Sequence, residues 1–203
     1  MPAIGITGGI ATGKTAFCEA LQEIVPGAKF FNADHAAHDL AELPEVKQEI
    51  RAEFGNGVFS RGGDLNREKV RAIILVDATK KRALEQILHP RIRCEWRAEA
   101  NKHRNSPDFF FTDIPLLYET DGETLCDRVV VVACSYEVQL ARVTARMSLK
   151  NGEAERMIKS QMPLEEKVAR ADHVVWNNGS RAVLMEQAHF FTALWQQQSW
   201  TKT

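Results

Sequence analysis

The sequence lacks a charge excess of either sign, and it lacks long apolar runs. Its 203 residues carry 26 Lys and Arg against 27 Asp and Glu, which gives a formal net charge of −1. No global basic field is therefore available to attract nucleic acid or a membrane surface, and we expect neither as a partner. No apolar run reaches the roughly 20 residues that a membrane-spanning helix needs. Hydrophobic residues make up 44% of the chain, as in an ordinary globular protein with a sizeable core.

Signals for export and for structural zinc are also missing. The N-terminus has neither the basic segment nor the apolar region of a signal peptide, which predicts a cytoplasmic protein. The four cysteines form no C-x-x-C pair, so we expect reduced, mostly packed thiols: Cys18, Cys94, Cys126 and Cys134. We expect a monomer, although nothing in the sequence sets the number of subunits.

The chain does have a glycine-rich phosphate-binding pattern near its start. The segment GITGGIATGKT contains G-x-x-x-x-G-K-[ST], the P-loop signature, from Gly8 to Thr15. A short apolar stretch at residues 3–7 precedes the loop and is expected to form a buried strand. The apolar residues after the loop have the spacing of one helical stripe: Phe17, Leu21, Ile24 and Val25. Strand, loop and helix occur in the required order, and we predict that the loop binds a nucleoside triphosphate.

Each part of this loop has a predicted chemical role. Gly8 and Gly13 permit backbone angles and close approaches that a side chain would block. Lys14 is expected to reach the β- and γ-phosphates of ATP, and the Thr15 hydroxyl to ligate Mg²⁺. The main-chain amides that form the predicted phosphate cradle, at the positive end of the following helix, are those of Gly9, Ile10, Ala11, Thr12, Gly13, Lys14, Thr15 and Ala16.

Apolar strand candidates alternate with helical patterns along the rest of the chain. The candidates are residues 3–7, 28–31, 109–113, 128–133 and 173–177. Each is followed by a loop and a helix-like stretch, which is typical of an α/β fold. We therefore predict a single domain over 1–203 with a parallel five-stranded sheet flanked by helices.

Two helical stretches depart from this alternation. Residues from about 44 to 104 read as consecutive helices, with Asn66 as an N-cap and Pro90 starting or kinking a helix, and we interpret them as an inserted lobe. The charge-rich residues from about 146 to 170 form either a solvated helical surface or a mobile lid over the nucleotide. A final helix over 181–198 has a packing stripe: Leu184, Ala188, Phe191 and Trp195.

Acidic and basic side chains are expected to complete the site. Asp113 ends a strand candidate and either binds Mg²⁺, directly or through water, or caps the turn that follows. Asp34 follows the second strand candidate and either accepts a hydroxyl proton during phosphoryl transfer or caps a helix. Arg142 and Arg146 lie one helical turn apart, and we expect phosphate contacts from them.

Several further polar residues each have two possible roles. Lys150, Arg156 and Lys159 either contact phosphate or form a solvated face. Asn177 or Asn178, in the segment WNNG, either hydrogen-bonds the adenine or belongs to a simple turn.

These segments together resemble the dephospho-coenzyme A kinase family over nearly the whole chain. GITGGIATGKT resembles the phosphate loop of that family, and FFNADHAAH resembles its DAD segment. Later segments resemble the family in the same order: GDLNREKVR, LEQILHPRI, DIPLLYE, VVVACSYEVQLAR, the glutamine of IKSQM, and ADHVVWNNG. The LHP-x-I and D-x-PLL-x-E patterns discriminate much better than a P-loop alone.

The resemblance implies a P-loop kinase core with a helical substrate lobe and a lid. It implies transfer of the ATP γ-phosphoryl group to the ribose 3′-hydroxyl of dephospho-CoA, which gives CoA and ADP in the last step of coenzyme A synthesis. By position, Asp34 is the catalytic carboxylate and Arg142 is the arginine that follows E-x-Q-L. Three positions of the substrate lobe either contact dephospho-CoA or support the lobe: Arg67, His89 and Pro90.

The sequence departs from the family where the first DAD aspartate is Asn32. We expect Asp34 to be the essential acid and Asn32 to keep a hydrogen-bonding role. In the phosphate loop, Ala11 and Thr12 replace the commoner glycine and serine, at positions where the pattern allows any residue.

Two alternatives remain at this stage. One is a kinase for another small hydroxyl substrate such as a nucleoside, against which the LHPRI and DIPLL segments argue. The other is a nucleotide-binding switch without kinase activity, which Asn32 favours; the N-K-x-D motif of guanine-specific switches is missing from the sequence.

Overall fold

A computed structural model describes residues 3–103, 106, 108–147, 149 and 151–197. These residues form two compact units. One consists of Asn32–Glu99, and the other of the described residues within 1–31 and 100–203. No helix in the described ranges has the length and apolar character needed to cross a membrane. The predicted ends of the inserted lobe at 104 and of the last helix at 198 lie outside these ranges.

The first unit is built on a parallel β-sheet. Its strands are β1 (Ala3–Gly8), β2 (Lys29–Asn32), β3 (Phe110–Asp113), β4 (Arg128–Ala133) and β5 (His173–Trp176), in the order β2-β3-β1-β4-β5. The pairings of β1 with β3 and β4, and of β4 with β5, are parallel. The structure thus confirms the predicted fold class and all five strand candidates to within one residue at each end.

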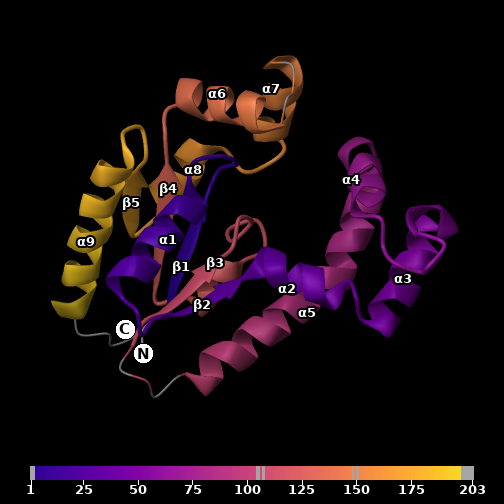
Figure 1. The fold of residues 1–203 in the computed structure, drawn as a ribbon, viewed down its shortest axis with the longest axis horizontal. Coiled ribbons are helices and arrows are strands. Elements are labelled where there is room, and N and C mark those ends of the chain that lie inside the picture. Colours follow the sequence, from indigo (N-terminus) through magenta and orange to yellow (C-terminus); the bar gives the residue numbers. More distant parts are fainter. Residues whose placement is uncertain (1–2, 104–105, 107, 148, 150, 198–203) are drawn as a thin grey trace. The chain divides into compact units, whose positions relative to one another are not determined.

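Helices α1 (Lys14–Ile24) and α9 (Arg181–Gln197) cover one face of this sheet (Figure 1). The core between them and the sheet includes Ile4 and Ile6 of β1, and Trp195 of α9 is fully buried in it. The predicted stripes of both helices face this core, because Phe17, Leu21, Leu184 and Ala188 are buried there while Ile24, Val25 and Phe191 pack against it.

Three further helices, α6 (Tyr136–Met147), α7 (Asn151–Lys159) and α8 (Leu164–Arg170), follow β4. Figure 1 shows α6 and α7 beyond the carboxyl ends of β1 and β4. The charge-rich segment is therefore helical, as predicted, and its role as a lid stays a prediction.

The chain after β3 differs from the prediction. A helix-like stretch was expected after every strand, but residues 115–121 form turns and are followed only by a short 3₁₀ helix, η2 (Gly122–Leu125). Pro115 opens this stretch, and the Gly122 amide closes the turns onto the Leu117 carbonyl (2.7 Å). Leu117 in these turns is fully buried and lies close to Gly5 of β1, so the stretch packs against the sheet without forming an α-helix.

The second unit is helical. It contains α2 (Ala33–Leu40), α3 (Pro44–Phe54), the 3₁₀ helix η1 (Asn56–Val58), α4 (Arg67–Val76) and most of α5 (Ala78–Lys102). Its small core contains Val46, Ile50, Val58, Val70 and Ile87. The predicted cap at Asn66 is confirmed, because its side-chain oxygen accepts the Lys69 amide (3.0 Å).

Pro90 lies inside α5, so the alternative that it starts a helix is wrong, while the alternative that it kinks one stays a prediction. A proline here removes the N–H that would bond the carbonyl four residues earlier. The helix nevertheless continues to Lys102, and the residue after the proline makes two side-chain contacts. The Arg91 guanidinium donates to the Ile87 carbonyl (2.6 Å) and to Glu49 of α3 (2.5 Å).

His173, the first residue of β5, makes the stability of the first unit sensitive to acid. Its ring packs against Phe191 and Trp195, and its Nε2 atom is buried with no hydrogen-bond partner among the described residues. Burial lowers the pKa of His173 below its ordinary value of 6.5, although Asp172 partly opposes the shift. At pH values between the lowered pKa of the folded protein and the ordinary pKa of the unfolded chain, His173 is protonated mainly in the unfolded chain. The free energy of unfolding therefore decreases as the pH falls through this range.

We therefore expect the melting temperature to decrease from about pH 7.5 to about pH 5.5, and His173→Phe to flatten that decrease. His89 contributes in the same direction, because burial lowers its pKa as well. The matched control is His189→Phe, at an exposed position of α9. A slope unchanged by His173→Phe would contradict the prediction.

Candidate active site

The phosphate loop joins the carboxyl end of β1 to the first turn of α1. Gly13 is the N-cap of α1 and has a φ of +99°, a conformation that side chains disfavour. A Cβ atom added to Gly13 would lie 1.8 Å from the Asn177 Nδ2 atom, and one added to Gly8 would lie 2.3 Å from the Val132 carbonyl oxygen. Both positions therefore require glycine, as the motif predicts.

Helix α1 begins without a side-chain cap. The first intrahelical bond runs from the Phe17 amide to the Gly13 carbonyl (3.1 Å). The four amides from Gly13 to Ala16 precede that bond, so they have no acceptor within the helix. Together with the helix dipole they make this N-terminus suited to an anion such as a phosphate group.

Two amides of the predicted cradle are directed to protein groups. The Ile10 amide donates to the Gln161 Oε1 atom (3.0 Å), and the Thr12 amide donates to the Gly9 carbonyl (3.4 Å). In this structure the expectation that Ile10 and Thr12 offer their amides to phosphate is therefore not met. For Gly9, Ala11 and the Gly13–Ala16 segment it stays a prediction.

Lys14 and Asp113 form an ion pair at this edge of the sheet. The Lys14 Nζ atom lies 2.5 Å from the Asp113 Oδ1 atom, and both side chains are about nine-tenths buried. The pair forms because Asp113 ends β3 opposite Ile6 of β1, the strand that runs into the loop. The structure thus brings the two predicted residues together, and the ion pair holds the Lys14 cation at the mouth of the loop.

Arg142 and Asn177 meet at one carbonyl of the loop. The Arg142 Nη1 atom donates to the Thr12 carbonyl (3.4 Å), and the Asn177 Nδ2 atom donates to the same oxygen (2.9 Å). Arg142 therefore lies beside the loop, and its contact with phosphate stays a prediction. Burial raises the pKa of the neighbouring Cys134 thiol, and the Arg142 charge partly opposes this shift.

Asn177 and Asn178 tie the last strand to its surroundings. Asn177 is buried, and its side chain supports the loop rather than standing open to a base. The Asn178 Oδ1 atom accepts the Ser135 amide (2.7 Å), which joins the loop after β5 to the loop after β4. Contact between adenine and Asn178 stays a prediction.

A buried lysine joins α8 to the segment that follows β3. The side chain of Lys167 is 0% exposed. Its Nζ atom donates to the Pro115 carbonyl (2.9 Å) and lies 2.9 Å from the Glu119 Oε1 atom. The same oxygen of Glu119 accepts the Met162 amide (3.0 Å). Burial lowers the pKa of Lys167, and its bond to Glu119 opposes that shift.

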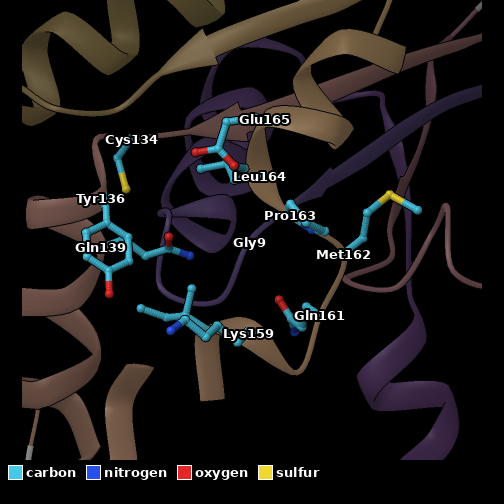
Figure 2. Close-up of a pocket in the computed structure, with 11 residues that line it drawn as sticks. Gly9, Cys134, Tyr136, Gln139, Lys159, Gln161, Met162, Pro163, Leu164 and Glu165 are labelled. Atoms are coloured by element: carbon cyan, nitrogen blue, oxygen red, sulfur yellow. The ribbon is translucent and has the colours of Figure 1, made fainter. Parts of the chain in front are cut away.

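A pocket of about 260 Å³ lies next to the phosphate loop. Gly9 of the loop contributes to its wall, together with Tyr136 and Gln139 of α6 and residues from the end of α7 to the start of α8 (Figure 2). Lys159 lines this pocket, whereas Arg146 and Arg156 are exposed on α6 and α7. Lys150 lies outside the described residues.

Asp34 lies in the second unit, in the first turn of α2, with an exposed side chain. The alternative that it caps this helix is wrong, because the N-cap is Asn32, whose Oδ1 atom accepts the His35 amide (2.9 Å). The hydrogen-bonding role expected for Asn32 is thereby confirmed. Asparagine caps a helix about as well as aspartate, so the departure from the family preserves this turn.

The three predicted substrate-lobe residues also lie in the second unit. The Arg67 guanidinium donates to the His38 carbonyl (3.2 Å) and to Glu42 (3.1 Å), which links α4 to the end of α2. His89 is half-buried and Pro90 is exposed, both on α5. Arg67 thus supports the unit, and contact of the three residues with substrate stays a prediction.

Oxygen donors suited to Mg²⁺ are available beside the loop. Thr15 has an exposed side chain in the first turn of α1, and Asp113 supplies a carboxylate. Mg²⁺ in nucleotide sites uses one or two protein oxygens and completes its shell with phosphates and water, so this pair fits the ion. Among the described residues, no group of three or more His, Cys, Asp or Glu side chains could hold a metal by itself.

Sequence reasoning missed three side chains that hold the loop: Gln139, Gln161 and Asn177. Asn177 was considered only for contact with adenine or for a simple turn. Gln139 and Gln161 stand within segments that resemble the family, which was the available signal. Their distance in sequence from the loop, 129 to 165 residues, hides the contacts.

A parallel sheet whose first strand runs into a glycine loop with a lysine, followed by a helix without a side-chain cap, is the arrangement of P-loop nucleotide-binding proteins, kinases among them. The sequence model of the dephospho-CoA kinase family matches residues 2–182. The chain belongs to the dephospho-CoA kinase family, which confirms the resemblance of its segments.

Individual relatives agree with this membership. Dephospho-CoA kinase of Symbiobacterium thermophilum is 42% identical over 183 residues, which cover 89% of this chain and 75% of that protein. The enzyme of Fusobacterium nucleatum is 35% identical over 188 residues, which cover 93% and 95%. The structure of dephospho-CoA kinase from Campylobacter jejuni superposes with a TM-score of 0.73 at 25% identity, covering 96% of this chain and 97% of that one.

Proposed function

We propose that this chain carries out the reaction of its family, the transfer of the ATP γ-phosphoryl group to the ribose 3′-hydroxyl of dephospho-CoA. The products are CoA and ADP, and the reaction is the last step of coenzyme A biosynthesis. The observation that carries the proposal is the uncapped start of α1 with Lys14 beside it, in a chain that the family model matches from residue 2 to residue 182. The family favours this reaction over a nucleoside kinase or a switch.

The phosphate loop supplies the charge that the transfer needs. The amides from Gly13 to Ala16 hold the phosphate tail of ATP, and Lys14 neutralises charge that develops on the transferred group. Arg142 stands at the Thr12 carbonyl, within reach of the same phosphates once they bind. Phosphoryl transfer depends mainly on such positioning and charge neutralisation, and these residues provide both.

The acceptor hydroxyl requires a group that orients it and takes its proton. Asp34 is our candidate, since the Asn32 cap leaves its carboxylate outside the capping of α2. Arg67, His89 and Pro90 are the candidates for contact with dephospho-CoA in the helical unit. The segments 44–104 and 146–170 are proposed to act as substrate lobe and lid.

We further propose that Thr15 and Asp113 hold Mg²⁺. A bound Mg²⁺ would neutralise part of the negative charge of the phosphates. Asp113 also has a structural role, because its ion pair with Lys14 holds the lysine beside the loop. We place the enzyme in the cytoplasm as a monomer, in line with the expectations from its sequence.

An assay of ADP release tests the function directly. Purified protein with ATP, Mg²⁺ and dephospho-CoA should release ADP in step with CoA formation, and a panel of nucleosides in place of dephospho-CoA should give little ADP. No release with dephospho-CoA would overturn the proposal in favour of a binding switch. ADP release with a nucleoside but not with dephospho-CoA would favour the alternative that the protein is a nucleoside kinase.

A further inference from the structure

The main chain of Ile10 in the phosphate loop is held by two glutamines. The Gln139 Nε2 atom of α6 donates to the Ile10 carbonyl (2.9 Å). The Gln161 Oε1 atom, between α7 and α8, accepts the Ile10 amide (3.0 Å). Figure 2 shows the two side chains on either side of Gly9. One residue of the loop thus receives a donor and an acceptor from separate parts of the fold.

The residue that follows explains why such support is needed. Ala11 has a φ of +57°, in the left-handed region that alanine disfavours. A loop that holds a disfavoured conformation needs fixed neighbours to keep it. Gln139 lies close enough to the loop to be such a neighbour, since a Cβ atom added to Gly9 would lie 2.5 Å from the Gln139 Nε2 atom.

The residue next to Gln161 is itself anchored. The Met162 amide donates to Glu119, which pairs with the buried ammonium of Lys167. This cluster fixes the turn between α7 and α8 to the segment after β3. The backbone that carries Gln161 is therefore held in place next to the loop.

Packing between this turn and α6 is incomplete. The pocket of about 260 Å³ lies between them, with Gln139 and Gln161 both in its wall. The Ile10–Gln161 hydrogen bond connects the turn directly to the loop beside this space.

We propose that Gln161 is a positioning residue that ties the turn between α7 and α8 to the phosphate loop and sets the loop for nucleotide before it binds. It acts through the Ile10 amide and touches no phosphate itself. The inference rests on the proposed binding of ATP at this loop. It assigns to Gln161 an effect on nucleotide affinity, and little effect on dephospho-CoA or on the transfer step at saturating ATP.

The variant Gln161→Met removes the acceptor and keeps the length of the side chain. We expect its Kd for ADP, measured by calorimetry, and its KM for ATP to rise about 3- to 10-fold, the range for one lost hydrogen bond. The kcat at saturating ATP and the KM for dephospho-CoA should stay within about twofold. Gln161→Ala should raise the Kd for ADP and the KM for ATP by a similar factor. Agreement between the two replacements shows that the effect does not come from a folding defect in one of them.

The matched control is Gln187→Met. Gln187 of α9 is half-buried like Gln161 and also bonds main-chain groups, accepting the Trp176 amide and donating to the Trp176 carbonyl (2.9 Å each). Its replacement should lower the melting temperature and leave the KM for ATP unchanged, which separates loss of stability from loss of positioning.

Hydrogen exchange of the Ile10 amide, followed by NMR without nucleotide, tests the contact itself. The amide should exchange slowly in wild-type protein and in Gln161→Glu, which keeps an acceptor oxygen, and fast in Gln161→Met. Equal exchange in wild type and Gln161→Met, or an ADP Kd and ATP KM unchanged in Gln161→Met, would overturn the inference. Wild-type protein that fails to bind ADP would instead refute the proposed function, and this inference with it.

Discussion

Replacement of Asp34 by asparagine should lower kcat by about 10²-fold or more, the usual scale for a group that accepts a proton in the transition state. Asparagine keeps the size of the side chain but cannot take the proton of the acceptor hydroxyl. The residue lies exposed in the first turn of α2, where Asn32 provides the cap, so the helix should not need its charge. We therefore expect the melting temperature and the Kd for ADP to stay close to those of the wild type.

The control for this prediction is Asp39→Asn. Asp39 is an exposed carboxylate on the same helix, and its loss changes the charge of α2 by the same amount. Single-turnover measurement with both variants compares the transfer step itself. Turnover of Asp34→Asn at the wild-type rate would remove Asp34 from the mechanism and leave the hydroxyl without a proton acceptor in the present proposal.

Replacement of Lys14 by alanine should reduce kcat/KM for ATP by about 10²- to 10³-fold, as expected when a preorganised charge aimed at the transition state is lost. The variant has a second defect, because it leaves the nearly buried Asp113 carboxylate without the lysine that lies 2.5 Å away. Loss of one partner of a buried ion pair is strongly destabilising. We therefore expect a lower melting temperature as well.

The double variant Lys14→Ala with Asp113→Asn separates the two defects. It should recover much of the lost melting temperature, since the buried carboxylate charge that lost its lysine is gone, while activity stays low because Lys14 and the proposed Mg²⁺ ligand Asp113 are both replaced. Lys29→Ala, at an exposed position of β2, is the control for general loss of a lysine. Recovery of activity in the double variant would mean that Lys14 serves only to neutralise Asp113.

The sheet and the phosphate loop were predictable because each has a local signal. Buried parallel strands such as β4 read as continuous apolar runs, and the spacing of Gly8, Gly13 and Lys14 is set by phosphate chemistry. The stripes of α1 and α9 follow in the same way from helical periodicity.

The errors arise where tertiary contacts decide the local structure. Pro90 was expected to start or kink a helix, but it lies inside α5, next to the contact of Arg91 with Glu49 of α3. The stretch after β3 folds into turns that contain the fully buried Leu117, close to Gly5 of β1. The local sequence around Pro90 and Leu117 shows neither of these contacts.

The supports of the loop were missed for a related reason. Gln139 and Gln161 are ordinary polar residues of helical segments, and their function depends on a partner more than 120 residues away. Glutamine has no spacing rule toward a main-chain group, unlike the P-loop lysine. Only the folded chain reveals that Ile10 is the point where they meet.

The buried Lys167 limits how much of the proposed 146–170 lid could move. Its ammonium bonds the Pro115 carbonyl and pairs with Glu119, and Glu119 also accepts the Met162 amide. Movement of α8 away from this segment would leave the buried ammonium without these partners, which is strongly unfavourable. Met162 and α8 therefore belong to the fixed part of this unit, and the proposed lid movement is limited to residues before Met162.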